Sequence, residues 1–84
     1  MDDARAASAT FRQNAGEGIG QLHGIGQSLS AAEQGFRGKL GNTSHPRVVE
    51  AEARCREARQ KIADAVHALN AAREAADQLS AELH

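Results

Sequence analysis

Small and apolar residues recur along the second half of the chain at alternating steps of three and four positions. This stripe comprises Val48, Ala51, Cys55, Ala58, Ile62, Ala65, Leu69, Ala72, Ala76, Leu79 and Leu83. Such spacing places every member on one face of an α-helix. The pattern therefore predicts a helix over about residues 46–83, with Glu and Arg residues on its solvated face.

The same stepping runs through the first half, although that half contains all eight glycines. Its stripe comprises Ala4, Ser8, Phe11, Ala15, Gly18, Leu22, Ile25, Leu29, Ala32 and Phe36. Glycine costs about 1 kcal/mol relative to alanine inside a helix, so composition alone favours a loop over residues 16–26. Because the period persists on both sides of that segment, we predict a helix over about residues 3–36.

Between the two helices lies a break at residues 37–45. Gly41 can end a helix, Thr43 or Ser44 can cap the next one, and Pro46 is tolerated in a first helical turn. The sequence therefore predicts an all-α fold in which residues 1–84 form a single domain, an antiparallel two-helix hairpin.

Folding the chain at this turn brings the two stripes together. Phe36 then meets Val48, Leu29 meets Cys55, Ile25 meets Ala58 and Leu22 meets Ile62, so that large residues mostly face small ones. The predicted intramolecular seam contains Phe11, Leu22, Ile25, Leu29, Val48, Cys55, Ile62, Leu69 and Leu79. Gly18 opposite Ala65 would leave a gap, either for a tight backbone contact or for a partner's side chain.

The hydrophobic residues are mostly small, because 18 of them are alanine. So few large side chains give a thin core, and we expect a second copy or a related helical hairpin to complete a four-helix bundle. Gly16, Gly20 and Gly24 form a strip that could admit the partner helix, and they are the predicted partner interface. The same spacing pairs helices in membranes, which leaves a membrane-active peptide as an alternative, although Gln21 and Gln27 argue against stable insertion.

Charge and composition argue against several functions. Ten Lys and Arg against 11 Asp and Glu, with only two aromatic residues, give no basis for binding nucleic acid. Asp64 and His67 have the spacing of half a helical metal site, but no second acidic pair completes it. We therefore expect no metal and no cofactor. No nucleophile has an identifiable base, so we expect no catalytic residues and no enzymatic activity.

The tripeptide Phe36-Arg37-Gly38 lies near the middle of the chain. In a hairpin of two long helices it resembles the Trp-x-Gly motif of the WXG (ESAT-like) family of type VII secretion substrates. The resemblance implies that Phe36 and Gly38 form a turn motif. It also implies an antiparallel four-helix bundle with itself or a relative, exported as a pair or escorting a larger secreted protein. The chain contains no tyrosine, so a tyrosine-based export signal would come from the partner.

The first residues have neither the cationic start nor the apolar stretch of a Sec signal peptide, and no apolar run approaches the roughly 20 residues that span a bilayer. We expect a cytoplasmic bacterial protein, or one exported without a Sec signal peptide. The alternative to a secretion factor is an intracellular helical adaptor, an assembly chaperone or a small coiled-coil subunit, which would require the same seam.

Overall fold

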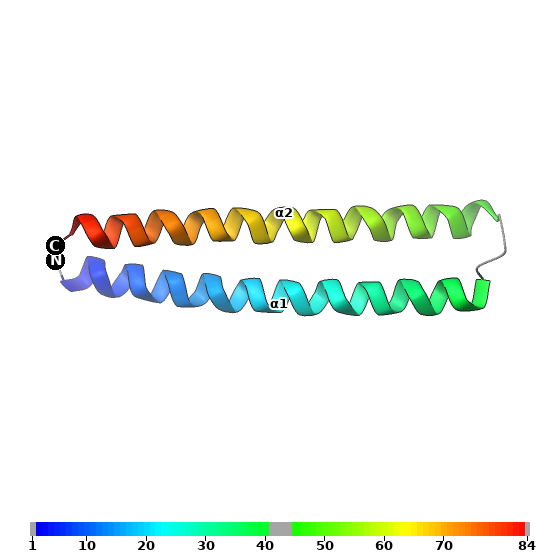
Figure 1. Cartoon of the computed structure of the whole chain (residues 1–84), viewed down its shortest axis with the longest axis horizontal. Coiled ribbons are helices and arrows are strands. Elements are labelled where there is room, and N and C mark those ends of the chain that lie inside the picture. Colours follow the sequence, from blue (N-terminus) through cyan, green and yellow to red (C-terminus); the bar gives the residue numbers. More distant parts are fainter. Residues whose placement is uncertain (1, 41–44, 84) are drawn as a thin grey trace.

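Two helices make up the structure, a computed structural model that describes residues 2–40 and 45–83. Helix α1 spans Asp2–Leu40 and helix α2 spans Pro46–Glu82. They lie side by side and run in opposite directions, so that both ends of the chain lie at the same end of the molecule (Figure 1). The result is a rod of 61 × 15 × 13 Å. The predicted all-α helical hairpin is confirmed.

Helix α1 continues through its glycines and ends later than predicted. None of the described glycines has a positive φ angle, so the helical backbone is kept throughout. Arg37 and Lys39 lie in the last turn, where positive charge is favourable at a helix C-terminus. Phe36, which was predicted at the end of the helix, and Gly38 both lie inside α1, and the predicted place of Gly38 in the turn is therefore wrong.

Helix α2 begins at Pro46, and the residue that caps it is His45. The imidazole Nδ1 of His45 accepts a hydrogen bond from the backbone N–H of Arg47 at 3.1 Å. The backbone of His45 is extended, with φ −55° and ψ 130°, as the residue before a proline prefers. Pro46 occupies the first turn as predicted. Thr43 and Ser44, the predicted caps, and Gly41 lie outside the described residues.

Alternate members of each predicted stripe form one line of the seam between the helices. Each of these residues is buried or half-buried: Ser8, Ala15, Leu22, Leu29 and Phe36 of α1, with Val48, Cys55, Ile62, Leu69, Ala76 and Leu83 of α2. Of the members between them, Gly18, Ala58, Ala65 and Ala72 are also half-buried, and the others are exposed. Phe11, Ile25 and Leu79 were predicted for the seam but are 46%, 51% and 49% exposed. For these three residues the prediction is wrong, because the helices are rotated so that a second line of residues completes the seam.

This second line is largely polar. On α1 it consists of Arg12, Ile19, Gly26 and Glu33, and on α2 of Glu52, Arg59, Val66 and Ser80, all of them buried or half-buried. The register of the hairpin also differs from the prediction by about one helical turn. A Cβ atom at Gly26 would lie 3.9 Å from Cγ2 of Ile62, where Leu22 was expected. The shift follows from the additional turn of α1, which moves the point where the chain folds back.

The hairpin has little core of its own. The described residues that are buried are Ser8, Ala15, Ile19 and Glu33, all on α1. No described residue of α2 reaches the same degree of burial. Two of these four residues are polar, so Ala15 and Ile19 are the buried hydrophobic residues of the described part, and the other apolar seam residues are half-buried.

Candidate interaction surface

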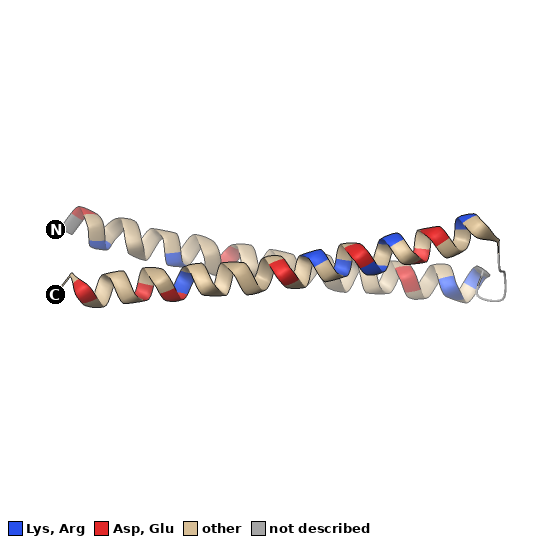
Figure 2. Cartoon of the chain, turned by 90° about the horizontal axis from the view of Figure 1, so that it is seen from above, with Lys and Arg blue, Asp and Glu red and all other residues tan. Residues whose placement is uncertain are grey.

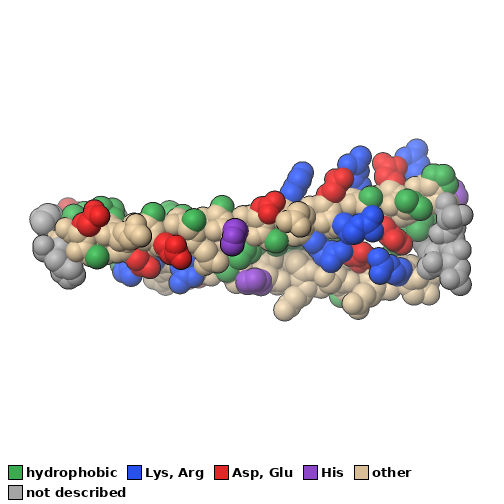
Figure 3. Space-filling model, turned by 45° about the horizontal axis from the view of Figure 1, so that its top comes forward, with side chains coloured by type: hydrophobic (Ala, Val, Ile, Leu, Met, Phe, Trp, Pro, Cys, Tyr) green, Lys and Arg blue, Asp and Glu red, His purple; other side chains and the backbone are tan. Residues whose placement is uncertain are grey.

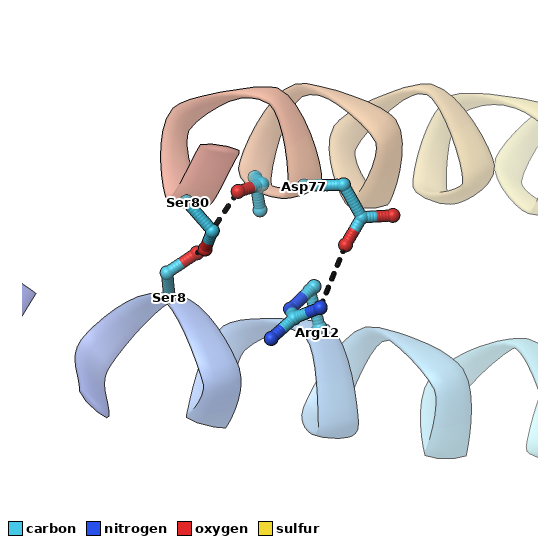
Figure 4. Close-up of polar contacts among 5 residues, drawn as sticks. Ser8, Arg12, Asp77 and Ser80 are labelled. Carbon is cyan, nitrogen blue, oxygen red and sulfur yellow. Dashed lines mark hydrogen bonds and ion pairs between the residues drawn. The ribbon is translucent and has the colours of Figure 1, made fainter. Parts of the chain in front are cut away.

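Near the chain ends, polar groups join the two helices (Figure 4). The Ser8 hydroxyl donates a hydrogen bond to the backbone oxygen of Ala76 at 3.0 Å, and its oxygen lies 2.8 Å from that of Ser80. Because the single hydrogen of Ser8 is used, the Ser80 hydroxyl is the donor between the two. One turn further along, Nη1 of Arg12 lies 2.9 Å from Oδ1 of Asp77. These contacts hold the open end of the hairpin together.

Near the turn, the seam contains a charged cluster centred on Glu33. The Glu33 side chain is only 8% exposed, and each carboxylate oxygen has its own arginine. Arg59 Nη2 of α2 lies 2.9 Å from Oε2, and Arg37 Nη2 of α1 lies 3.3 Å from Oε1. Arg37 Nη2 also lies 3.9 Å from Oε2 of Glu52. A buried carboxylate is stable only when it is paired, so this cluster helps to set the register of the helices.

Two buried atoms of the polar seam lack a partner among the described residues. They are Nε of Arg12 and Nε of Arg59. A buried donor without an acceptor costs about 1–3 kcal/mol. The hydrogen bonds of the polar seam are therefore incomplete, and this seam does not give the stability of an apolar core.

The remaining members of the two stripes follow one side of the seam, and we call this line the apolar edge. It consists of Ala4, Phe11, Gly18, Ile25 and Ala32 of α1 with Ala51, Ala58, Ala65, Ala72 and Leu79 of α2. On each helix its members are seven residues apart, so they stay on one side of a two-helix coiled coil. Its three large side chains are each about half exposed, whereas Gly18, Ala58, Ala65 and Ala72 are half-buried.

Towards the turn, the apolar edge contains a hollow of about 170 Å³. Ala32, Phe36, Ala51 and Cys55 line it, with Glu33 and Glu52 at its base in the seam. The hollow brings Ala32 of α1 and Ala51 of α2 to one surface, which shows that the two stripes border the same side of the seam. Phe36, the aromatic residue of the predicted turn motif, is half-buried here.

The opposite side of the seam carries a groove of about 590 Å³. It is lined on α1 by Leu22, His23, Gly26, Gln27, Ser30, Ala31 and Gln34 and on α2 by Arg59, Ile62, Ala63 and Val66. The groove therefore mixes apolar residues with amide, hydroxyl, imidazole and guanidinium groups. The apolar edge differs from it, because apolar or small residues recur there every seven positions on both helices.

The glycine strip predicted as the partner interface lies beside the apolar edge, and Gly24 lines a hollow together with Ile25 of that edge. Gly16 is half-buried, and a Cβ atom there would lie 4.0 Å from Cζ of Arg73. Gly20 and Gly24 are exposed, and Cβ atoms built on them would meet no described atom within 4 Å. The strip leaves room for a partner helix, and its role as an interface stays a prediction.

The sequence analysis did not identify Ile19, which at 9% exposed is the most buried large hydrophobic side chain among the described residues. It did not identify Glu33 either. The available signal was the line Arg12, Ile19, Gly26 and Glu33, whose members are seven residues apart, as are those of the apolar edge. The polar residues in this line hide the signal, because the sequence does not show that Arg12 and Glu33 pair with charged residues of the other helix.

The described residues show no grouping of three or more His, Cys, Asp or Glu side chains that could hold a metal ion. In the same part of the chain, neither helix contains a segment with the length and apolar character needed to cross a membrane. The one cysteine, Cys55, is half-buried in the hollow beside Phe36.

Comparison of the chain with protein-family models, with curated proteins and with solved structures gives no match. The WXG resemblance therefore remains a prediction from the sequence.

Proposed function

We propose that this chain is a non-enzymatic protein-interaction module that pairs with a second helical hairpin through the apolar edge, forming a four-helix bundle. The observation that carries the proposal is the division of each apolar stripe. Half of its members enter the seam of the hairpin. Of the other half, the large side chains of Phe11, Ile25 and Leu79 remain about half exposed, whereas Gly18, Ala58, Ala65 and Ala72 are half-buried.

The free energy of burying apolar surface favours association with a partner. Covering the exposed halves of Phe11, Ile25 and Leu79 would contribute about 1 kcal/mol for each side chain. The thin core makes this gain important, since the hairpin has only two buried hydrophobic residues among those described, Ala15 and Ile19. A helical partner fits because residues that recur every seven positions suit the packing of side chains between helices.

The experiment compares two substitutions of exposed apolar residues. Ile25→Gln removes a large side chain from the apolar edge, whereas Val49→Gln removes one that is 54% exposed and lies off that edge. Each tagged variant is used to recover partners from the native host, which are identified by mass spectrometry. We expect wild type and Val49→Gln to recover a helical-hairpin protein or the chain itself, and Ile25→Gln to lose it. Equal recovery by both variants would refute the role of the apolar edge.

The glycine strip provides a competing surface for the same function. If Gly16, Gly20 and Gly24 contact the partner, Gly20→Leu weakens the association by filling the space that the partner helix needs. If the apolar edge is the interface, Gly20→Leu leaves the association unchanged. The same recovery experiment therefore separates the two surfaces.

The WXG resemblance supports a narrower role as a type VII secretion substrate or escort factor. The two helices of 39 and 37 residues agree with the expected hairpin of nearly equal arms. The test compares the culture medium of the host with that of a strain lacking its membrane-anchored secretion ATPase. Loss of the protein from the medium, with a cytosolic marker unchanged, supports export. Equal amounts in both media favour the intracellular adaptor instead.

A further inference from the structure

We propose that the partner of the apolar edge is a second copy of this chain, aligned so that the turn end of one hairpin lies against the chain ends of the other. This inference rests on the proposed interaction function and specifies both the partner and the register. In this arrangement α1 packs against α1 of the second copy, α2 packs against α2, and a two-fold axis crosses the rod near its middle.

The first argument is the order of large and small residues along α1. Phe11 and Ala32 lie equally far from a point between residues 21 and 22, and so do Gly18 and Ile25. A two-fold axis at that point puts Phe11 against Ala32 of the second copy, and Ile25 against Gly18. Moving the axis to the next equivalent position sets Phe11 against Ile25, or Ile25 against itself. Only the first register pairs every large side chain with a small one, as dense packing requires.

Helix α2 gives the same axis independently. Leu79 and Ala51 are equally far from Ala65, as are Ala72 and Ala58. An axis at Ala65 therefore pairs the whole edge of α2 with that of the second copy. Leu79 then projects towards the hollow of about 170 Å³ that Ala51 helps to line.

The hairpin register brings these two axes to the same level. Across the seam, Cβ atoms at Gly18 and Gly26 would lie 3.7 Å and 3.9 Å from atoms of Leu69 and Ile62. Ala65, midway between these two α2 residues, thus lies level with residue 22 of α1, beside the midpoint of the α1 pattern. One axis can satisfy both helices, which the register expected from the sequence would not have allowed.

The distribution of charge selects the head-to-tail direction. The half of the rod next to the turn, residues 22–65, contains seven Lys and Arg against five Asp and Glu. The half that contains the chain ends has three Arg against six Asp and Glu. Most Lys and Arg positions on the ribbon of Figure 2, and most basic side chains on the face drawn in Figure 3, lie towards the turn. Opposite net charges meet when two copies align head to tail, whereas turn-to-turn alignment brings like charges together.

The decisive experiment exchanges Ile25 with Gly18, the small residue against which Ile25 of the second copy is proposed to pack. Sedimentation equilibrium gives the dimer dissociation constant of wild type, Gly18→Ile, Ile25→Gly, the double variant and the control Gly20→Ile. We expect each single change at Gly18 or Ile25 to weaken the dimer about ten-fold or more, about 1.4 kcal/mol. The double variant should return to within about three-fold of wild type, because the exchange keeps both packing and glycine content. Gly20 lies off the apolar edge, so the Gly20→Ile dimer should have the same dissociation constant as wild type.

Cross-linking locates the axis. In a Cys55→Ala background, Ala65→Cys should form an inter-chain disulfide on oxidation, because the axis brings that position close to its own copy. Ala58→Cys should form none, since two copies of that position lie about 20 Å apart along the rod.

Three results would overturn the proposal: a monomeric wild-type protein, no recovery in the double variant, or cross-linking at Ala58→Cys in preference to Ala65→Cys. If the wild-type protein is a monomer but recovers a different hairpin from the host, and Ile25→Gln abolishes that recovery, then self-pairing is refuted and the interaction surface is kept. If Ile25→Gln and Val49→Gln both recover the partner as well as wild type does, the apolar edge is not the interaction surface.

Discussion

At the scale of single residues, Glu33 has the least expected environment. Its carboxylate lies in the seam and pairs with Arg59 at 2.9 Å and with Arg37 at 3.3 Å. The two arginine side chains are 38% and 55% exposed, so they can reach water when the carboxylate is removed. The cluster is therefore expected to contribute modestly to stability and to oppose sliding of one helix along the other.

We expect Glu33→Ala to lower the free energy of unfolding by about 1–2 kcal/mol. A double-mutant cycle with Arg59→Ala should give a coupling energy of about 1 kcal/mol, measured by urea denaturation. Glu50→Ala is the control, because its pair with Arg47 is exposed and should contribute less than about 0.5 kcal/mol. Equal effects at Glu33 and Glu50 would contradict a role for the buried cluster.

Two isoleucines on α1 test the rotation of the helix. Ile19 is 9% exposed and Ile25 is 51% exposed. At concentrations where the protein sediments as a monomer, Ile19→Ala should lower the free energy of unfolding by about 2–4 kcal/mol. Ile25→Ala should lower it by no more than about 1 kcal/mol, because much of that side chain is already in water. The reverse order would show that the seam predicted from the sequence is the right one.

At the scale of the helices, α1 is continuous but weakened by its glycines. Gly20 and Gly24 have helical backbone angles and open space around their would-be Cβ atoms. Nothing in the described part of the hairpin requires glycine at either position. The two residues therefore reduce the intrinsic stability of α1 without a packing gain inside this chain.

Gly20→Ala and Gly24→Ala should each raise the free energy of unfolding by about 0.5–1 kcal/mol, because alanine restricts the unfolded chain and favours the helix. Thermal denaturation followed by circular dichroism provides the measurement. Gly18→Ala is a useful comparison, since its Cβ atom would lie 3.7 Å from Cδ1 of Leu69 and make an ordinary contact. A loss of stability at Gly20 or Gly24 would indicate that a close contact covers the strip.

The sequence was sufficient to predict the helices and the hairpin, but not the rotation of the helices about their own axes. Periodicity identified both stripes correctly, including the stretch of α1 that contains most of the glycines. It could not show that Phe11 and Ile25 lie outside the seam. A polar line enters the seam because Glu33 meets Arg59 and Arg12 meets Asp77, and these pairings depend on the register between the helices.

The candidate surface was predictable only in part for a related reason. The sequence predicted a partner from the scarcity of large apolar residues, and it placed that partner on the glycine strip. The apolar edge could not be distinguished from the seam, since its members belong to the same stripe. The end of α1 was also missed, because the prediction ended the helix at Phe36 with the apolar stripe, whereas Arg37 and Lys39 lie in its last turn.

At the scale of the whole molecule, the hairpin is a rod with a groove of mixed character on one side of the seam, the apolar edge on the other and unlike net charges in its two halves. The regular repeat of apolar residues on one side supports the proposed pairing with a second hairpin, which would cover the apolar edge.

Salt should weaken the head-to-tail dimer. The net charges of the two ends attract one another over distances comparable with the Debye length, which is about 10 Å at 0.1 M salt. We expect the dissociation constant to rise several-fold from low to high sodium chloride, measured by sedimentation equilibrium. A constant that falls with added salt would favour turn-to-turn alignment, in which screening relieves repulsion.

The most direct test of the divided apolar stripe is isotope-filtered NMR on a dimer that combines one labelled and one unlabelled copy. This measurement distinguishes contacts within a chain from contacts between chains. We predict inter-chain contacts from the Ile25 methyl groups to the Gly18 α-protons, and contacts of Ile19 only within its own chain. Inter-chain contacts at Ile19, or Ile25 in contact with α2 of its own chain, would contradict the account.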